Sequence, residues 1–295
     1  MNIVIHRGTH QIGGSAIEIS TASTRIVLDF GNELSLDEKY IPINLDIDGV
    51  TKGMPDCEGI VISHYHMDHL GQLTAALPEI PLYMGMLSKE VAMISAEYQD
   101  KDLYLRLLGA NTFRGGEAFT IGDIRIRPLV IDHSAVDSYM FVIESEGKRV
   151  LYTGDFRMHG VRGHVLEKLI RTYIGDVDVL ITEGTSLSRN AHDGISEREV
   201  LDDISSYIQD GKYVFVMCSS TNIDRIMGIW QNMPRDKVLI CDAYQKRILD
   251  TVINNVYYES SLYRRQDRPL VLDIGKYPKY YMDNGFVSLA RATEN

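Results

Sequence analysis

Four side chains that can bind a metal ion lie within six positions of the sequence: His64, His66, Asp68 and His69. They follow a continuous apolar run at residues 59–63, which is typical of a strand buried on both faces. In an extended turn, His64 and His66 project to the same side, while Asp68 and His69 follow as the chain bends toward a helix. Imidazole nitrogen and carboxylate oxygen are the ligands that zinc prefers at open, catalytic sites. The spacing therefore predicts that two imidazoles hold one ion, and that the carboxylate and the third imidazole face a second.

This His-x-His-x-Asp-His pattern resembles the metal motif of the metallo-β-lactamase superfamily of metal-dependent hydrolases. Three further positions extend the resemblance along the chain: Asp29 in VLDFG, His133 in IDHS and Asp155 in YTGDF. The resemblance implies that Asp29 is not itself a ligand. Its carboxylate would accept the far N–H of a ligand histidine and so fix the tautomer of that ring.

The resemblance also implies two ligand sets. The first metal site would contain His64, His66 and His133. The second would contain Asp68, His69 and Asp155, with Asp155 bridging the two ions. The expected cofactors are two divalent ions, either zinc or manganese. The imidazole at His66, where diiron relatives carry glutamate, favours hydrolysis over redox chemistry.

Residues 179–185 (VLITEGT) resemble the acidic motif that opens the β-CASP branch of this superfamily, the group of ribonuclease J and of the endonuclease of messenger-RNA 3′-end cleavage. The resemblance implies a phosphodiester as substrate, in RNA or less often in DNA. A metal-activated water would attack the phosphorus. Asp68 would orient that water, and Glu183 would support the cleft.

A second candidate contact with substrate follows the apolar run at residues 213–217, where four small polar residues precede an expected helix: Ser219, Ser220, Thr221 and Asn222. Exposed amides at a helix N-terminus suit phosphate binding. Helix-capping residues of the same types also begin many helices that bind nothing. Both interpretations remain open.

The sequence departs from the β-CASP pattern after the expected cap domain begins. Two further histidines are expected there, one completing the second metal site and one near the leaving group, yet no histidine follows His192. The second site is therefore expected to be weak, in a chain that is cut short or unusually compact. His159 and His164 are candidate replacements, although such loop histidines are more often exposed or bonded to backbone.

Two other functions remain open beside that of an RNA nuclease. A truncated relative could bind one metal ion, or none, without catalysis. The same type of metal centre also hydrolyses small esters and thioesters. Metal content measured together with phosphodiester turnover distinguishes these readings, because only a nuclease requires both.

The elements expected around these residues define the fold class, α/β. For residues 1–190 we expect an αββα metallo-β-lactamase sandwich, because short strands dominate and the ligands lie at strand ends. A polar connector at residues 188–195 leads into residues 191–295, where alternating strands and helices predict a partial parallel α/β cap of the β-CASP type. The expected strands are residues 3–5, 16–19, 25–28, 59–63, 118–121, 124–130, 139–144, 149–152, 179–182, 213–217, 238–240 and 270–272. The expected helices are residues 70–77, 86–97, 103–108, 196–209, 222–231 and 244–253.

Composition sets the remaining limits. The 295 residues are 44% hydrophobic with a formal net charge of −11, so the chain can build a core and is not a generally basic nucleic-acid binder. Three cysteines without a Cys-x-x-Cys pair indicate neither a disulfide framework nor a thiolate zinc site. The sequence shows no signal peptide and no apolar run of membrane-spanning length. We expect a cytoplasmic protein that acts on RNA or another phosphodiester, with no membrane partner, and that could form a homo-oligomer.

Overall fold

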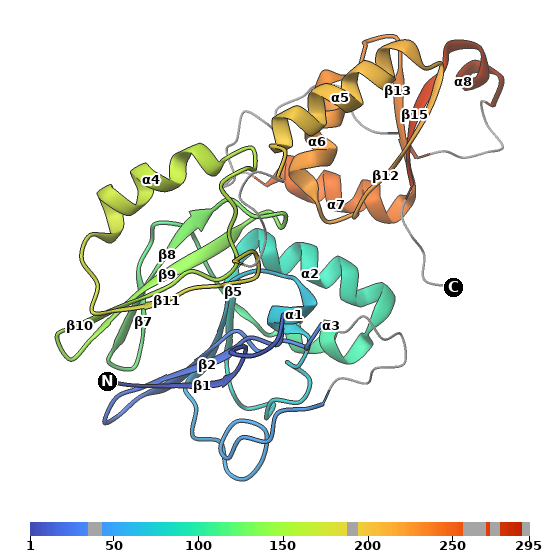
Figure 1. The fold of residues 1–295 in the computed structure, drawn as a ribbon. Helices are drawn as coiled ribbons and strands as arrows, with labels where there is room; N and C mark the ends of the chain where they lie inside the picture. Colours follow the sequence, from blue (N-terminus) through green and yellow to red (C-terminus); the bar gives the residue numbers. More distant parts are fainter. Residues whose placement is uncertain (35–42, 188–193, 256–269, 272–277, 291–295) are drawn as a thin grey trace. The chain divides into compact units, whose positions relative to one another are not determined.

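A computed structural model describes residues 1–34, 43–187, 194–255, 270–271 and 278–290 (Figure 1). The chain divides into two compact units. The first comprises Met1–Met158 and Arg162–Asn190, and the second His159–Val161 and Ala191–Asn295. Most of the connector expected at residues 188–195 lies outside the described residues, as does His192. No helix in the described part of the chain is long and apolar enough to cross a membrane.

The first unit begins with a sheet whose strands lie side by side in chain order. The strands are β1 (Asn2–Arg7), β2 (Ala16–Ser20), β3 (Arg25–Leu28), β4 (Gly59–Ile62), β5 (Leu82–Gly85) and β6 (Asn111–Phe113). The first three pair antiparallel, and β3 to β6 pair in parallel. The carboxyl ends of β3 and β4 therefore meet at one edge, where Asp29 and Ser63 follow them.

A second sheet in the same unit has the order β11-β10-β9-β8-β7. Its strands are β7 (Phe119–Ile121), β8 (Ile124–Ile131), β9 (Ser138–Ser145), β10 (Lys148–Tyr152) and β11 (Val179–Ile181). A hairpin turn at Glu146 and Gly147 joins β9 to β10. Both residues have positive φ, 51° and 69°, as a type I′ turn requires.

The two sheets pack face to face over one apolar core. Ile26 and Leu28 from the first sheet meet Phe141 and Ile143 from the second, all fully buried. The outer face of the first sheet carries α2 (Met86–Gln99), which packs on β5 and β6 and against α3 (Lys101–Leu108). The outer face of the second sheet packs against the segment around α4 (Leu166–Leu169). These layers are the expected αββα sandwich (Figure 1).

The second unit is a parallel α/β structure. Its sheet has the order β12-β15-β13-β14, with every neighbouring pair parallel. The strands are β12 (Tyr213–Met217), β13 (Val238–Cys241), β14 (Leu270–Val271) and β15 (Phe286–Ala290). The helices are α5 (Glu197–Asp210), α6 (Ile223–Asn232), α7 (Ala243–Asn254) and α8 (Pro278–Asn284). Trp230 of α6 and Val287 of β15 are buried in its core.

One expected helix is wrong. Residues 70–77 were expected to be helical, but the helix there is α1 (Met67–Leu70), and turns follow it. Tertiary partners take the backbone hydrogen bonds that a longer helix would use. The amide of Gln72 donates to the Phe30 carbonyl at 2.9 Å, and that of Leu77 to the Val50 carbonyl at 2.8 Å. This packing fixes the irregular segment against the loops that follow β3.

Residues 213–217 form the expected strand, which is not covered on both faces. β12 lies at the edge of its sheet, and alternate residues along it are exposed. An apolar run predicts a strand without showing whether both of its faces are covered. Three strands were not anticipated at all: β5, β6 and β15.

A capping box begins α5. The Ser196 hydroxyl accepts a hydrogen bond from the Glu199 amide at 3.2 Å, and the Glu199 carboxylate accepts one from the Ser196 amide at 2.7 Å. We predict that Ser196→Ala lowers the free energy of unfolding by about 1 kcal/mol. Urea denaturation should detect this loss, and Ser196→Thr should recover most of it. An unchanged midpoint in the alanine variant would contradict the prediction.

Candidate metal centre

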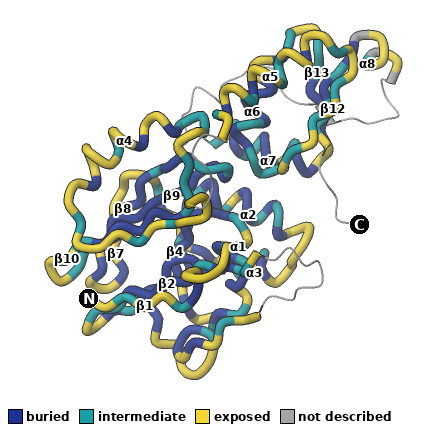
Figure 2. The backbone as a smooth tube through the Cα atoms, viewed as in Figure 1, coloured by how far each residue is buried: buried dark blue, intermediate teal, exposed yellow. Residues whose placement is uncertain are grey.

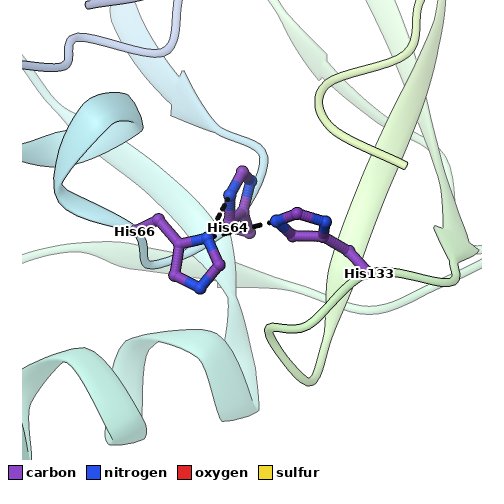
Figure 3. Close-up of side chains that lie close together, drawn as sticks. All are labelled: His64, His66 and His133. Atoms are coloured by element: carbon purple, nitrogen blue, oxygen red, sulfur yellow. Dashed lines mark hydrogen bonds between the residues drawn. The ribbon is translucent and has the colours of Figure 1, made fainter. Parts of the chain in front are cut away.

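Three histidines converge in the first unit (Figure 3). His64 follows β4, His66 precedes α1, and His133 follows β8. His66 Nδ1 lies 3.1 Å from His64 Nε2 and 3.1 Å from His133 Nε2. Ligand nitrogens at about 2.0–2.1 Å from a tetrahedral zinc ion would lie about 3.3 Å apart. The donor type and spacing of these three nitrogens therefore fit one zinc ion.

The ring of His64 is held from its other side. His64 is completely buried, and its Nδ1 lies 3.0 Å from the hydroxyl of Ser63. That hydroxyl donates in turn to Asp29 Oδ2 at 2.8 Å. Donation from His64 Nδ1 to Ser63 leaves Nε2 with the lone pair that a ligand needs.

A second cluster shares His64 with the first. One ligand atom each from His64, His69 and Asp155 lies within 4.8 Å of the others. His69 Nε2 is 3.2 Å from Asp155 Oδ1, and Asp68 Oδ2 is 3.6 Å from the same nitrogen. Asp155 Oδ2 is also 3.9 Å from His133 Nε2, so this carboxylate lies between the two clusters. All six residues expected as ligands therefore lie together.

Asp29 is hydrogen-bonded to residues of both clusters, directly or through Ser63. Its Oδ2 accepts from His69 Nδ1 at 2.7 Å and from the hydroxyl of Tyr152, while its Oδ1 accepts from the Ser63 amide at 2.7 Å. The carboxylate is fully buried, and the backbone has φ +55°, a left-handed conformation that aspartate tolerates better than most residues. Asp29 thus fixes the ring of His69 and, through Ser63, that of His64.

Glycines bring two loops against the backbone of Asp68. The amides of Gly14 and Ser15 donate to the Asp68 carbonyl at 3.1 and 3.2 Å. A Cβ at Gly31 would lie only 1.7 Å from that carbonyl oxygen, so this approach requires glycine. Arg7 supports the same loops by donating to the carbonyls of Gly14 and Gly31. These contacts hold the backbone of Asp68 beside the clusters.

Burial sets the charge of the first cluster. Burial, together with repulsion from neighbouring histidines, lowers the pKa of His66 to about 4 and that of His133 to about 3. Burial likewise places the pKa of His64 well below its usual value, with added repulsion from His69, His133 and His66. Three neutral imidazoles at neutral pH are in the protonation state that metal binding requires.

In the second cluster, neighbouring charges as well as burial set the pKa values. Burial lowers the pKa of His69, but the Asp29 and Asp155 carboxylates outweigh it and hold that pKa well above its usual value. Burial acts to raise the pKa of Asp155, and the histidines around it lower it overall. For Asp68, burial raises the pKa. In the metal-free chain, a protonated His69 therefore balances the carboxylates.

A pocket of about 800 Å³ opens beside the second cluster. Asp68, His69, Asp155 and Glu183 line one part of it. Glu183 is half-buried, which raises its pKa, and its Oε1 accepts from the Phe156 amide at 2.8 Å. The acidic residue expected to support the cleft therefore bonds to the loop that carries Asp155.

The remaining candidates are four residues at one turn of the second unit and two histidines. Ser219, Ser220, Thr221 and Asn222 belong to the second unit, at the turn between β12 and α6. The hydroxyls of Ser219 and Thr221 lie 3.0 Å apart, and no side-chain hydrogen bond caps α6. Their contact with phosphate stays a prediction. His159 and His164 are exposed, and neither belongs to the metal-type clusters found among the described residues.

Sequence reasoning missed two residues that support the clusters. Ser63 links Asp29 to His64, and Tyr152 donates its hydroxyl to Asp29. Both lie at or next to a strand end, one residue before His64 and three before Asp155. That position was the available signal, because polar groups at neighbouring strand ends meet at one edge of the sandwich.

Comparison with known proteins identifies the family of the chain. Residues 25–201 match the family described as "Beta-lactamase superfamily domain". An RNase J-like protein of Methanocaldococcus jannaschii is 27% identical over 223 residues, covering 72% of this chain and 49% of that protein. The endoribonuclease YSH1 of Gibberella zeae is 25% identical over 281 residues, covering 88% of this chain and 32% of that protein. The chain thus spans half or less of the length of these two relatives.

A solved structure shares the fold across both units. It is described as a protein of unknown function from Enterococcus faecalis V583. The two structures agree with a TM-score of 0.79 at 18% sequence identity, covering 99% of this chain and 77% of the other. At that identity, the likeness establishes the fold class.

Proposed function

Because the chain belongs to the beta-lactamase superfamily, we propose that it is a metal-dependent hydrolase of phosphodiester bonds, with RNA as its substrate. Similarity to ribonucleases supports the reaction class. The second unit is proposed as a partial β-CASP-type cap, and a cytoplasmic setting accords with three free cysteines.

The observation that carries this proposal is the pair of clusters around His64. Nitrogen and carboxylate oxygen donors within 4.8 Å of one another form two adjoining ligand sets beside an open pocket. We assign His64, His66 and His133 to the first ion. Since Nε2 of His64 can bind only one ion, we assign Asp68, His69 and Asp155 to the second. Zinc fits these ligands best, and manganese is the alternative.

Asp68, Glu183 and Asp29 have different roles in the proposed reaction. When bound, two divalent ions supply an activated water and neutralise charge that develops on the phosphoryl oxygens. Asp68 orients the attacking water through its carboxylate, and the loops of Gly14 and Gly31 hold its backbone in place. Glu183 keeps the Asp155 loop in position through the Phe156 amide. Asp29 holds the rings of His64 and His69 in the tautomers that leave their Nε2 atoms free.

The two ions should be retained unequally. The first site has three neutral imidazoles, whereas the second has one imidazole and two carboxylates and requires His69 to lose its proton. We predict that dialysis against a chelator removes the ion of the second site first, so that the protein passes through a state with one bound ion. Elemental analysis after timed dialysis measures this. Two ions lost at the same rate would contradict the assignment.

Occupancy of the second site should also depend on pH. The neighbouring carboxylates raise the pKa of His69, so protons compete with the metal at neutral pH and compete less as the pH rises. Binding of the second equivalent should therefore be tighter at about pH 8 than at about pH 6. Calorimetric titration at the two values measures the difference, and the first equivalent, on imidazoles that are already neutral, serves as the internal control.

One observation favours a different substrate. Several pocket-lining residues are exposed and aliphatic: Ile5, Ile12, Leu34 and Leu187. The guanidinium of Arg7, also in the lining, is bonded to Glu33 and to three carbonyl groups. An apolar pocket wall, in which the guanidinium of Arg7 is already hydrogen-bonded within the protein, suits the acyl group of an ester or thioester. Hydrolysis of such a substrate is the second candidate function.

Three substrates separate the candidates. Metal-replete, chelated and re-metallated protein should be tested on 5′-labelled RNA, on a chromogenic phosphodiester and on a short acyl thioester. Cleavage of RNA that the chelator removes and zinc restores supports the nuclease. Metal-dependent turnover of the thioester alone supports the second candidate. Retention of metal without turnover of any substrate identifies a non-catalytic relative.

A further inference from the structure

The second unit exposes one face of β12. Tyr213, Phe215 and Met217 are 41%, 70% and 75% exposed, and the alternation along the strand can be followed in Figure 2. The residues between them, Val214 and Val216, are half-buried, on the opposite side of the strand. α5 packs against β12. The exposed side chains therefore share one face of an edge strand.

The neighbouring strand adds a third ring to this face. Phe286 of β15 is paired in register with Tyr213. Its ring centroid lies 5.2 Å from that of Tyr213 and 5.7 Å from that of Phe215, the latter in an edge-to-face arrangement. Tyr213, Phe215 and Phe286 thus form a contiguous aromatic platform. The ammonium of Lys212 lies 5.3 Å from the centroid of the Tyr213 ring.

Flat aromatic rings on a sheet surface suit one class of ligand in particular. Unpaired bases stack on such rings without regard to sequence, and an adjacent cation can meet the phosphate backbone. Charge does not oppose this. Residues 191–295 contain 13 basic and 15 acidic residues, so they carry two of the eleven excess negative charges of the chain. A polyanion would meet a nearly neutral unit.

We propose that the aromatic platform binds single-stranded RNA by base stacking on Phe215 and its neighbouring rings, with Lys212 contacting the backbone. The choice of RNA rests on the proposed function. The platform would be a binding surface separate from the residues that carry out hydrolysis, and it would hold a strand without reading its sequence. Stacking on rings, rather than burial of apolar area, is the feature to test.

Binding can be measured without cleavage in the 295-residue chain treated with a chelator. The probe is a fluorescein-labelled oligoadenylate of about 12 nucleotides, and an abasic phosphodiester of the same length is the comparison. Phe215→Ala should weaken binding of the oligoadenylate by about 5- to 150-fold. Phe215→Leu, which keeps an apolar side chain but lacks a ring, should also weaken it, and Phe215→Trp should restore it. Tyr207→Ala removes an aromatic residue that is 74% exposed on α5 and should have no effect.

The outcomes distinguish this proposal from the nuclease itself. Unchanged affinity in Phe215→Ala, or equal binding of the abasic probe, overturns the platform whether or not metal-replete protein cleaves RNA. Platform-dependent binding in a protein that cleaves nothing supports the platform and contradicts the nuclease. Analytical ultracentrifugation tests the other occupant of this face. If Phe215→Ala dissociates a wild-type dimer and leaves RNA affinity unchanged, the face is an interface between copies, and the proposal is wrong.

Discussion

Asp68→Ala is expected to lower single-turnover cleavage of RNA by about 10²–10⁴-fold, the usual contribution of a group that moves or orients a proton in the reaction. The carboxylate faces the second cluster, with Oδ2 3.6 Å from His69 Nε2. Its removal takes away both the group proposed to orient water and one ligand of the second ion. Quenched-flow cleavage of 5′-labelled RNA by metal-replete protein measures the rate.

Two controls make this result specific. Asp68→Ala should retain the first metal equivalent, because His64, His66 and His133 are unchanged. Asp56→Ala, a substitution of an exposed aspartate that belongs to neither cluster, should cleave like the wild type. Cleavage that persists in Asp68→Ala would show that another residue orients the water, and His159 would be the next to replace.

Asp29→Ala is expected to damage both stability and metal binding. The substitution leaves the buried Nδ1 of His69, the amide of Ser63 and the hydroxyl of Tyr152 without their acceptor. Removing one partner of a buried charged pair commonly costs about 3–5 kcal/mol. Loss of a group that orients a ligand costs about 10–100-fold in metal affinity. Urea denaturation and zinc titration in parallel measure the two effects.

Asparagine is the matched control at this position. It tolerates the left-handed backbone of residue 29 and keeps one carbonyl oxygen as acceptor, but it carries no charge. Asp29→Asn should therefore be more stable than Asp29→Ala, while its zinc affinity remains below that of the wild type. Wild-type affinity for both ions in Asp29→Ala would contradict the role assigned to Asp29.

The sequence predicted the metal-type cluster because its residues are linked by local spacing and by strand ends. His64 and His66 lie two positions apart after a buried strand, so one turn brings them together. His133 and Asp155 are distant in sequence, but each follows a strand of the second sheet, and the two sheets present these ends at the same edge. The family resemblance identified His133 and Asp155 as candidate ligands, and the αββα layers explain why they lie beside His64 and His66.

Other features depend on contacts that no local pattern encodes. The helix expected at residues 70–77 is replaced by turns because Phe30 and Val50, far away in sequence, accept the amides of that segment. The run at residues 213–217 predicts a strand equally well whether one face or both are covered. The place of Ser63 between Asp29 and His64 depends on two parallel strands ending side by side. Each is a tertiary property.

The order of strands in the second sheet also bears on how the protein is made. β15 lies between β12 and β13, although it follows both in the chain. During synthesis the first sandwich can close early, since its strands pair largely with neighbours in sequence. In the second sheet, β12 and β13 cannot pair with their shared neighbour until residues 286–290 leave the ribosome. Nascent chains of this protein should therefore leave the backbone edges of β12 and β13 unpaired, and open to chaperones, until translation of the second unit is nearly complete.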